Sequence, residues 1–245
     1  TYIVNDLIDL PQDRRHWSKR ARPLASGELP IGVGVALGGS LLFAGLSIAA
    51  AMGPGVAAVV FAYLVGTLAY SFRLKRVPIL DVGMLASLFT LRLFLGVVAI
   101  GAVISPWLFV FSMALFLSLS IAKRHTEVVR MRAHGETKTA GRGYLSSDEP
   151  MLLAFGAVAT GGALVLLVMY LMAEAFRAGF YSFPSALWAM PVVLFLWLGR
   201  IWLLCGRGEL DDDPVAFALR DAPSRLLGLA MGAVFAFATF GGAVL

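Results

Sequence analysis

The stretch IGVGVALGGSLLFAGLSIAAAMG, residues 31–53, decides the fold class, because it runs for 23 residues without a charged side chain. A helix needs about 20 apolar residues to cross a bilayer core that is about 30 Å thick. The composition agrees, since 59% of the residues are hydrophobic, 14% are charged and the mean hydropathy is +0.84. These values exclude a soluble globular domain.

Further apolar stretches of similar length recur along the chain. They exceed the ~10-residue segments of membrane β-barrels, so only helices fit. The predicted spans are residues 31–53, 55–72, 79–101, 106–122, 151–173, 184–204 and 224–245. The predicted fold is an all-α, polytopic membrane bundle. Residues 1–4 resemble the last turn of another span, so we expect residues 1–245 to be one transmembrane domain that lacks its N-terminal part.

The charged residues indicate an orientation in the membrane. Eighteen of the 20 Lys and Arg residues lie in alternate connections or in the span ends that flank them, and the exceptions are Arg92 and Arg177. Fourteen of the 15 acidic residues share that side. The positive-inside bias places these connections in the cytoplasm and predicts a multi-pass protein of the cell membrane.

A polar motif, NDLIDLPQDR, occupies residues 5–14 ahead of the first complete span. In a helix, Asn5, Asp6, Asp9 and Asp13 lie on one face, because they are three or four residues apart. Like charges held this close repel each other unless a cation lies between them. Hard oxygen ligands suit Mg²⁺, which is often shared with substrate phosphates. The alternative interpretation is a solvated helix cap.

Cations that suit phosphate oxygens surround this motif. They comprise Arg14 at the end of the motif and Lys19, Arg20 and Arg22 after it, Lys75 after the second span with Tyr70 and Asp81 on either side, and Lys123 and Arg124 with Glu127 after the fourth span. A plain topology signal or an affinity for anionic headgroups explains some of this basicity equally well.

Arg92 lies inside an apolar stretch, eleven residues after Asp81. At about 100° per residue, eleven steps return to within about 20° of the same helix face. An arginine this deep in a membrane span is a functional candidate. A structural ion pair with an acid on another helix is the alternative.

Other classes of site find little support. Cys205 is the only cysteine in the sequence, which excludes an internal disulfide. The three histidines lack zinc-ligand spacing, and we expect His125 to lie in a loop. The basic patches lack interleaved stacking aromatics, so no nucleic-acid partner is expected. Residues 211–213, three aspartates, are either a second cation site or a solvated turn.

The opening motif, with Lys19-Arg20-x-Arg22-Pro23 behind it, closely resembles the first signature of the UbiA-type intramembrane prenyltransferases. The resemblance implies nine transmembrane helices, about eight of them present here, around a cavity open to the cytoplasm. The aromatic prenyltransferases of that superfamily carry a second Asp-x-x-x-Asp motif. The equivalent place here, residues 123–127, has no such pair. Tyr70 to Lys75, Asp81, Arg92, Lys123 to Glu127 and residues 218–221 are instead similar to the decaprenyl-phosphate phosphoribosyltransferase branch.

The resemblance implies a Mg²⁺-dependent transferase, whose partners are a diphosphate donor, an isoprenoid lipid phosphate and membrane lipids. Its expected reaction is transfer of 5-phosphoribose from phosphoribosyl diphosphate to a polyprenyl phosphate. The expected metal ligands are Asn5, Asp6, Asp9 and Asp13, and the expected catalytic residues are Asp6, Asp9, Lys75 and Arg92. The expected substrate-binding residues are Arg14, Lys19, Arg20, Arg22, Tyr70, Lys75, Asp81, Lys123, Arg124 and Glu127. Prenyl transfer to an aromatic or other small acceptor, and a transporter with charged gates, are the alternatives. The sequence leaves the oligomeric state open.

Overall fold

The computed structural model describes residues 2–14, 19–139, 142–210 and 214–241. The chain divides into two compact units, each described below by itself. The first comprises Thr1–Ile104 with Ala140–Gly143, and the second comprises Ser105–Thr139 with Tyr144–Leu245.

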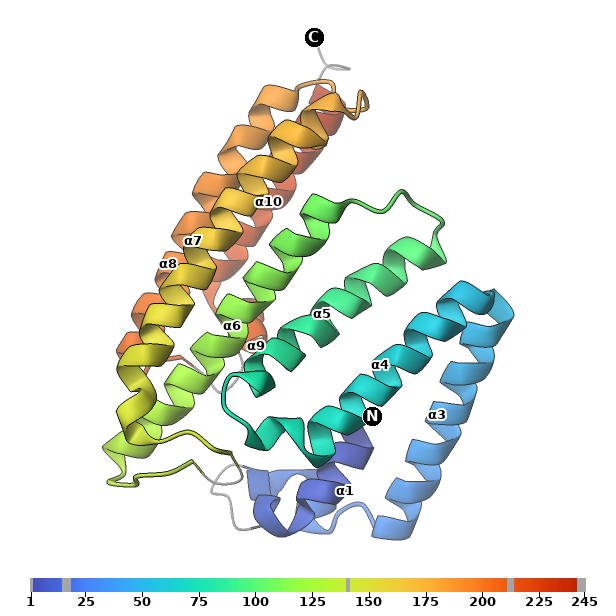
Figure 1. Ribbon diagram of the computed structural model, residues 1–245, viewed down its shortest axis with the longest axis vertical. Coiled ribbons are helices and arrows are strands. Elements are labelled where there is room, and N and C mark those ends of the chain that lie inside the picture. The colour runs from blue at the N-terminus through green and yellow to red at the C-terminus, as the bar shows by residue number, and fades with distance from the viewer. Residues whose placement is uncertain (1, 15–18, 140–141, 211–213, 242–245) are drawn as a thin grey trace. The chain divides into compact units, whose positions relative to one another are not determined.

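The first unit is built on helices that follow one another closely in the sequence (Figure 1). Its elements are α1 (Tyr2–Asp13), η1 (Lys19–Ala21), α2 (Pro23–Ser26), α3 (Ile31–Met52), α4 (Pro54–Phe72), η2 (Leu74–Arg76) and α5 (Leu80–Ala99). Gly53 joins α3 to α4 with φ 124°, a conformation that glycine adopts readily, and Pro54 starts α4 at a position that needs no N–H donor. Helix α4 packs against both α3 and α5, and α1 packs against α3.

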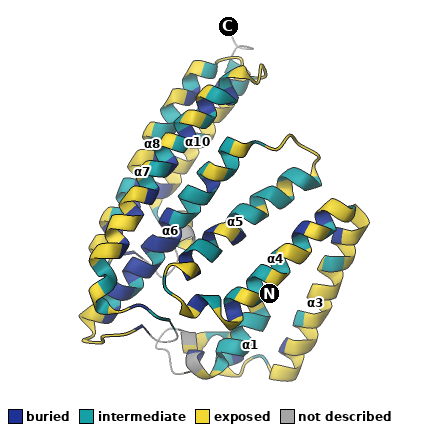
Figure 2. Cartoon of the chain, in the orientation of Figure 1, coloured by how far each residue is buried: buried dark blue, intermediate teal, exposed yellow. Residues whose placement is uncertain are grey.

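The second unit is a bundle of four long helices with short connecting helices (Figure 1). Its elements are α6 (Pro106–Ala133), η3 (Ser146–Asp148), α7 (Glu149–Ala173), η4 (Ala175–Arg177), η5 (Pro184–Trp188), α8 (Ala189–Gly206), α9 (Pro214–Arg220) and α10 (Ala222–Phe240). Helix α6 packs most extensively against α7. The core is made of apolar side chains that include Leu119, Leu171, Leu198 and Ile201. Figure 2 shows the buried positions along the helices in dark blue.

A chain of hydrogen bonds fixes three helices of this bundle together. Trp202 Nε1 on α8 donates to Ser118 Oγ on α6 at 3.0 Å, and Ser118 Oγ lies 2.8 Å from Thr160 Oγ1 on α7. The Thr160 hydroxyl donates to the carbonyl of Gly156 at 2.8 Å. A Cβ at Gly156 would overlap the Trp202 ring, so this close approach requires glycine.

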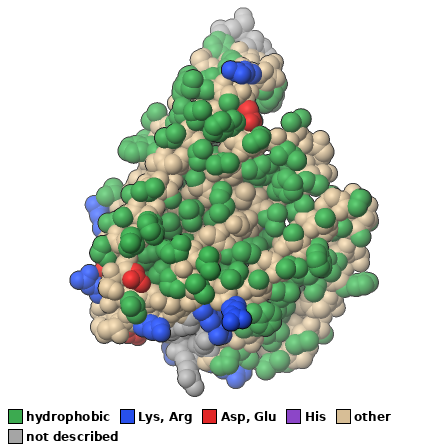
Figure 3. Space-filling model, viewed as in Figure 1, with side chains coloured by type: hydrophobic (Ala, Val, Ile, Leu, Met, Phe, Trp, Pro, Cys, Tyr) green, Lys and Arg blue, Asp and Glu red, His purple; other side chains and the backbone are tan. Residues whose placement is uncertain are grey.

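In the described part of the chain, seven helices are long and apolar enough to cross a membrane, and each overlaps one of the seven predicted spans. Large apolar side chains remain exposed along them, as the hydrophobic surface in Figure 3 shows. Helix α3 is the extreme case, with only 6% of its most apolar window buried. The prediction of a polytopic all-α membrane protein is therefore confirmed.

Helix α6 is longer than predicted, since it continues past residue 122 to Ala133. The polar extension keeps one apolar face, because Val128 and Met131 are buried. Gly135, with φ 74°, follows the end of the helix. This segment is helical because one of its faces is buried at helical spacing, although its overall hydropathy is low.

Candidate functional site

Helix α1 presents the acidic motif as the spacing predicted. The Asn5 side-chain amide donates to Asp9 Oδ2 at 3.2 Å, the expected contact between residues four apart. Asp6 and Asp9 are half-buried, while Asp13 is only 3% exposed. One face of this short helix therefore carries four oxygen-bearing side chains, partly withdrawn from solvent.

Arg22 lies between two of these carboxylates. Its Nη1 atom is 2.8 Å from Asp6 Oδ1 and 2.8 Å from Asp13 Oδ2. The residue precedes Pro23 at the start of α2 and has an extended backbone, as residues before proline generally do. This turn brings the guanidinium back over α1, so that one nitrogen bridges two acids.

Lys75 reaches the third carboxylate from a distant part of the sequence. Helix η2 directs its side chain inward, so that the residue is buried, and Nζ forms an ion pair with Asp9 Oδ1. The same nitrogen is 3.5 Å from Asn5 Oδ1. Three carboxylates thus face two cations, which leaves one net negative charge on this cluster.

The remaining predicted phosphate contacts near the motif are less enclosed. Arg14 and Arg20 are exposed, and Tyr70 is half-buried in α4. Lys19 lies in η1, but its side chain falls outside the described part of the structure.

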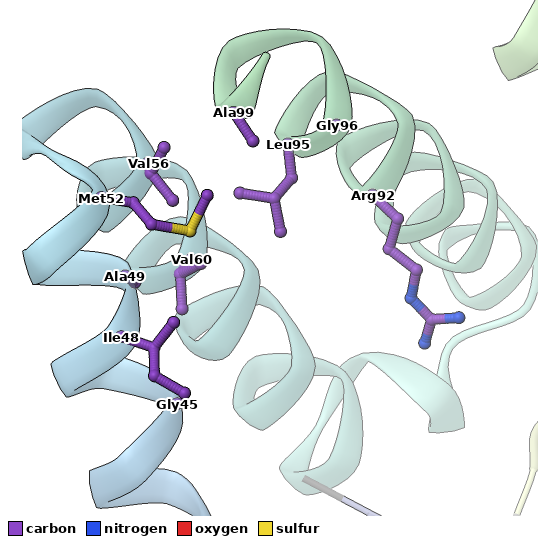
Figure 4. A pocket seen from close by; sticks show the side chains of 10 residues that line it. All are labelled: Gly45, Ile48, Ala49, Met52, Val56, Val60, Arg92, Leu95, Gly96 and Ala99. Atoms are coloured by element: carbon purple, nitrogen blue, oxygen red, sulfur yellow. The ribbon is translucent and has the colours of Figure 1, made fainter.

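Among the residues that the structure describes, Arg92 contacts aromatic side chains rather than the acidic cluster. Its Nε donates to the Tyr63 hydroxyl at 3.0 Å, and its guanidinium carbon lies 5.3 Å and 4.9 Å from the ring centroids of Tyr63 and Phe89. Arg92 is also at the edge of a cavity of about 380 Å³ between α3, α4 and α5 (Figure 4). Apolar side chains such as Met52 and Leu95 line most of that cavity, which makes it unsuited to a phosphate group.

In the second unit, Arg124 and Glu127 form an ion pair on α6, and Arg124 is 1% exposed. Lys123 is half-buried on the same helix. The expectation that His125 lies in a loop is wrong, because it is 2% exposed within α6 and its Nδ1 is 3.2 Å from Cys205 Sγ. Hydropathy misplaced it because the helix continues beyond its apolar part.

Asp221 is the N-cap residue of α10, at the end of the connection that follows α8. Its carboxylate accepts two hydrogen bonds from Arg200, at 3.1 and 2.9 Å, and two more from the backbone and hydroxyl of Ser224. The Arg200 hydrogen bonds, more than those of Ser224, lower the pKa of Asp221 from 3.8 to about 2. This carboxylate therefore caps α10 rather than facing a ligand.

The profile of the UbiA prenyltransferase family matches residues 1–221, which include the acidic motif and Lys75. The chain belongs to this family. The resemblance predicted from the opening motif is confirmed, and this UbiA chain is a member of a family of transferases.

Three relatives align with nearly the whole UbiA chain. It is 42% identical over 238 residues to the uncharacterized protein y4nM of Sinorhizobium fredii, covering 97% of this chain and 46% of that protein. It is 31% identical over 239 residues to the nodulation protein NoeC of Azorhizobium caulinodans, covering 96% and 76%. It is 30% identical over 240 residues to the decaprenyl-phosphate phosphoribosyltransferase of Mycobacterium tuberculosis, covering 96% and 77%. The chain thus spans less than half of the Sinorhizobium protein and about three-quarters of the other two.

The donor set on α1 of this UbiA chain fits Mg²⁺ in its chemistry. Within the described residues, no three acidic, His or Cys side chains are grouped closely enough to hold an ion by themselves. Mg²⁺, however, keeps several waters and usually takes only one or two carboxylates together with substrate phosphates. Asp6 and Asp9 meet that requirement, and the cations that contact them, Arg22 and Lys75, are side chains that a metal ion could replace.

One further contact within the first unit was not predicted from the sequence. Asp81, which is fully buried in the first turn of α5, forms an ion pair with Arg142, with 3.6 Å between Oδ2 and Nη1. The two residues are 61 positions apart, and no spacing rule links them. The three aspartates at 211–213 lie outside the described residues.

Proposed function

We propose that this chain is the transferase domain of a Mg²⁺-dependent enzyme that moves 5-phosphoribose from phosphoribosyl diphosphate to a polyprenyl phosphate. The observation that carries the proposal is the meeting of Asp9 and Lys75, which joins the acidic motif to a buried cation. Similarity to the mycobacterial phosphoribosyltransferase supports the choice of donor and acceptor.

The acidic face of α1 is assigned to the metal-bound diphosphate. Asp6 and Asp9 would hold Mg²⁺, with Asn5 orienting Asp9 and with Asp13 nearby. When bound, the ion neutralises charge on the departing diphosphate. Hard carboxylate oxygens support this assignment.

The neighbouring cations are assigned to phosphate oxygens. Arg22 and Lys75 already lie at the carboxylates. Mg²⁺ that arrives with the diphosphate would replace them there, and the two side chains would then contact phosphate oxygens. Arginine suits bidentate phosphate contacts, and lysine supplies a point charge. The exposed Arg14 and Arg20 are positioned on the same connection to attract the donor by long-range electrostatics.

The resemblance, rather than the geometry, assigns Lys123 and Arg124 to the phosphate of the lipid acceptor, and Glu127 forms an ion pair with Arg124. In the proposed reaction, an oxygen of the acceptor phosphate forms a bond to C1 of the ribose as the bond from C1 to diphosphate breaks. The acceptor is already ionised at neutral pH, so the reaction needs no strong base. The buried histidine of α6 is accordingly left without a catalytic role.

The positive-inside bias supports a multi-pass protein of the cell membrane with the acidic cluster on the cytoplasmic side. The apolar flanks of the seven helices would contact lipid tails and the isoprenoid chain. This arrangement lets a water-soluble donor and a lipid-soluble acceptor reach one enzyme.

The family description favours a second candidate, prenyl transfer from a prenyl diphosphate to an aromatic or other small acceptor. The same acidic face would then hold a prenyl diphosphate. The absence of an Asp-x-x-x-Asp pair at residues 123–127 argues against it.

The test uses the full-length protein in liposomes with Mg²⁺. One reaction receives labelled phosphoribosyl diphosphate and polyprenyl phosphate, and the other receives labelled prenyl diphosphate and an aromatic acid. We expect a lipid-linked phosphoribose product in the first, and its loss in Asp9→Asn. Product from the second reaction alone would overturn the proposal in favour of prenyl transfer.

A further inference from the structure

The connection between η2 and α5 is a strained corner. Leu80 N donates to Pro78 O at 2.8 Å, and Ile79 between them has φ 68° and ψ −46°. These values describe a classic γ-turn, which is rare. A β-branched residue with positive φ is a conformational outlier and persists only where its surroundings enforce it.

Part of that enforcement comes from Gly143. A Cβ at this position would lie 2.7 Å from the carbonyl oxygen of Arg76 and 2.7 Å from Pro78 Cδ. Both distances are shorter than non-bonded atoms tolerate, so only glycine lets the backbone rest against this corner.

The neighbouring Arg142 supplies a positive charge beside the buried carboxylate of Asp81. Asp81 is 0% exposed, and its carboxylate is 3.6 Å from Arg142 Nη1, whose side chain is 17% exposed. A carboxylate withdrawn from water requires a nearby positive charge. Residues 142 and 143 thus contact the corner through one ion pair and one close backbone approach.

Lys75 is directly affected, because the corner begins immediately after η2. Val77 N donates to Leu74 O at 3.1 Å, and Asp81 N donates to Val77 O at 3.1 Å, so hydrogen bonds run without a break from η2 into α5. The direction of the Lys75 side chain toward Asp9 therefore depends on how this corner is held.

We propose that Asp81 and Arg142 are positioning residues, which fix the corner so that Lys75 meets the acidic face of α1. The buried Asp81 carboxylate then serves Arg142 rather than a substrate phosphate. The inference rests on the proposed function in one respect, namely that Lys75 binds the diphosphate.

The experiment measures two quantities on the full-length protein in detergent. Hydrogen–deuterium exchange of residues 74–81 reports the corner, and calorimetric titration with Mg²⁺ and inorganic diphosphate reports the site. The variants are Asp81→Asn and Arg142→Gln, with Arg142→Lys as the conservative variant. Arg132→Gln is the control, because it removes an exposed ion pair with Glu149 from the same stretch of chain.

We expect faster exchange at residues 74–81 and about tenfold weaker diphosphate binding in Asp81→Asn and Arg142→Gln, a coupling typical of neighbouring residues. Arg142→Lys should retain most of the affinity, and Arg132→Gln should change neither quantity. In a Lys75→Gln background, Asp81→Asn should weaken binding no further, since its effect passes through Lys75. General destabilisation would instead add to the loss, and that result would overturn the inference.

Failure of the proposed function has a different signature. If Lys75→Gln alone leaves diphosphate binding unchanged, the proposed function fails. The exchange rates then decide the positioning by themselves, because faster exchange at residues 74–81 supports it and unchanged exchange overturns it.

Discussion

Replacing Lys75 by Gln removes the cation that faces Asp9 and raises the excess negative charge of the cluster on α1 from one to two. The lysine side chain is 7% exposed and the aspartate side chain 19% exposed, so water compensates little for the lost ion pair. Asp9 keeps its hydrogen bond from Asn5, so the loss falls below that of a fully buried pair. We expect a destabilisation of about 2 kcal/mol, which lowers the midpoint of thermal unfolding by about 4–8 °C.

Mg²⁺ should reverse more of this loss in the variant than it adds to the wild type. An ion at ten times its dissociation constant stabilises a protein by about 1.4 kcal/mol. In the wild type the ion must first displace Lys75 from Asp9, whereas in Lys75→Gln the carboxylate already lacks its counter-ion. The Mg²⁺-induced rise in midpoint should therefore be larger in the variant at equal concentration.

Thermal unfolding in detergent, across a Mg²⁺ titration, measures this difference. The matched control is Arg132→Gln, which removes an exposed ion pair worth at most about 1 kcal/mol and should respond to Mg²⁺ as the wild type does. An equal or smaller Mg²⁺ response in Lys75→Gln would refute the reasoning that the α1 carboxylates attract a cation.

Two further predictions concern the second unit. Gly156→Ala should displace the Trp202 ring and destabilise the bundle by about 1–3 kcal/mol in thermal unfolding, whereas Gly162→Ala, which faces open space, should have little effect. Equal midpoints for the two variants would contradict the close packing. The lowered pKa of Asp221 means that its ion pair with Arg200 contributes fully above pH 3.8 and loses its contribution as the pH falls toward about 2. Asp221→Asn should therefore show a shallower loss of stability over this range, and an unchanged acid profile would exclude the pair as its source.

Local periodicity and hydropathy were enough to predict the acidic helix and the membrane spans of both units. The spacing of Asn5, Asp6, Asp9 and Asp13 along α1 needs only the geometry of a helix, and the seven spans need only hydropathy. The motif's resemblance to one family then identified the class of protein.

Contacts between distant residues could not be predicted in the same way. Lys75 and Asp9 are 66 residues apart, and no spacing rule pairs that lysine, rather than a neighbouring cation, with Asp9. Arg142 looked like one of several loop cations until its contact with Asp81 was known. His125 was misplaced because its burial comes from packing against Cys205 rather than from the apolar run.

The central claim is that the acidic face of α1 binds a diphosphate through Mg²⁺, and calorimetric titration tests it most directly. Inorganic diphosphate is titrated into the full-length protein with and without Mg²⁺, for the wild type and for Asp9→Asn. We expect Mg²⁺ to strengthen diphosphate binding at least tenfold in the wild type, which corresponds to about 1.4 kcal/mol, and to have little effect in the variant. Binding that is equally tight without Mg²⁺, or a Mg²⁺ effect that survives in Asp9→Asn, would contradict it.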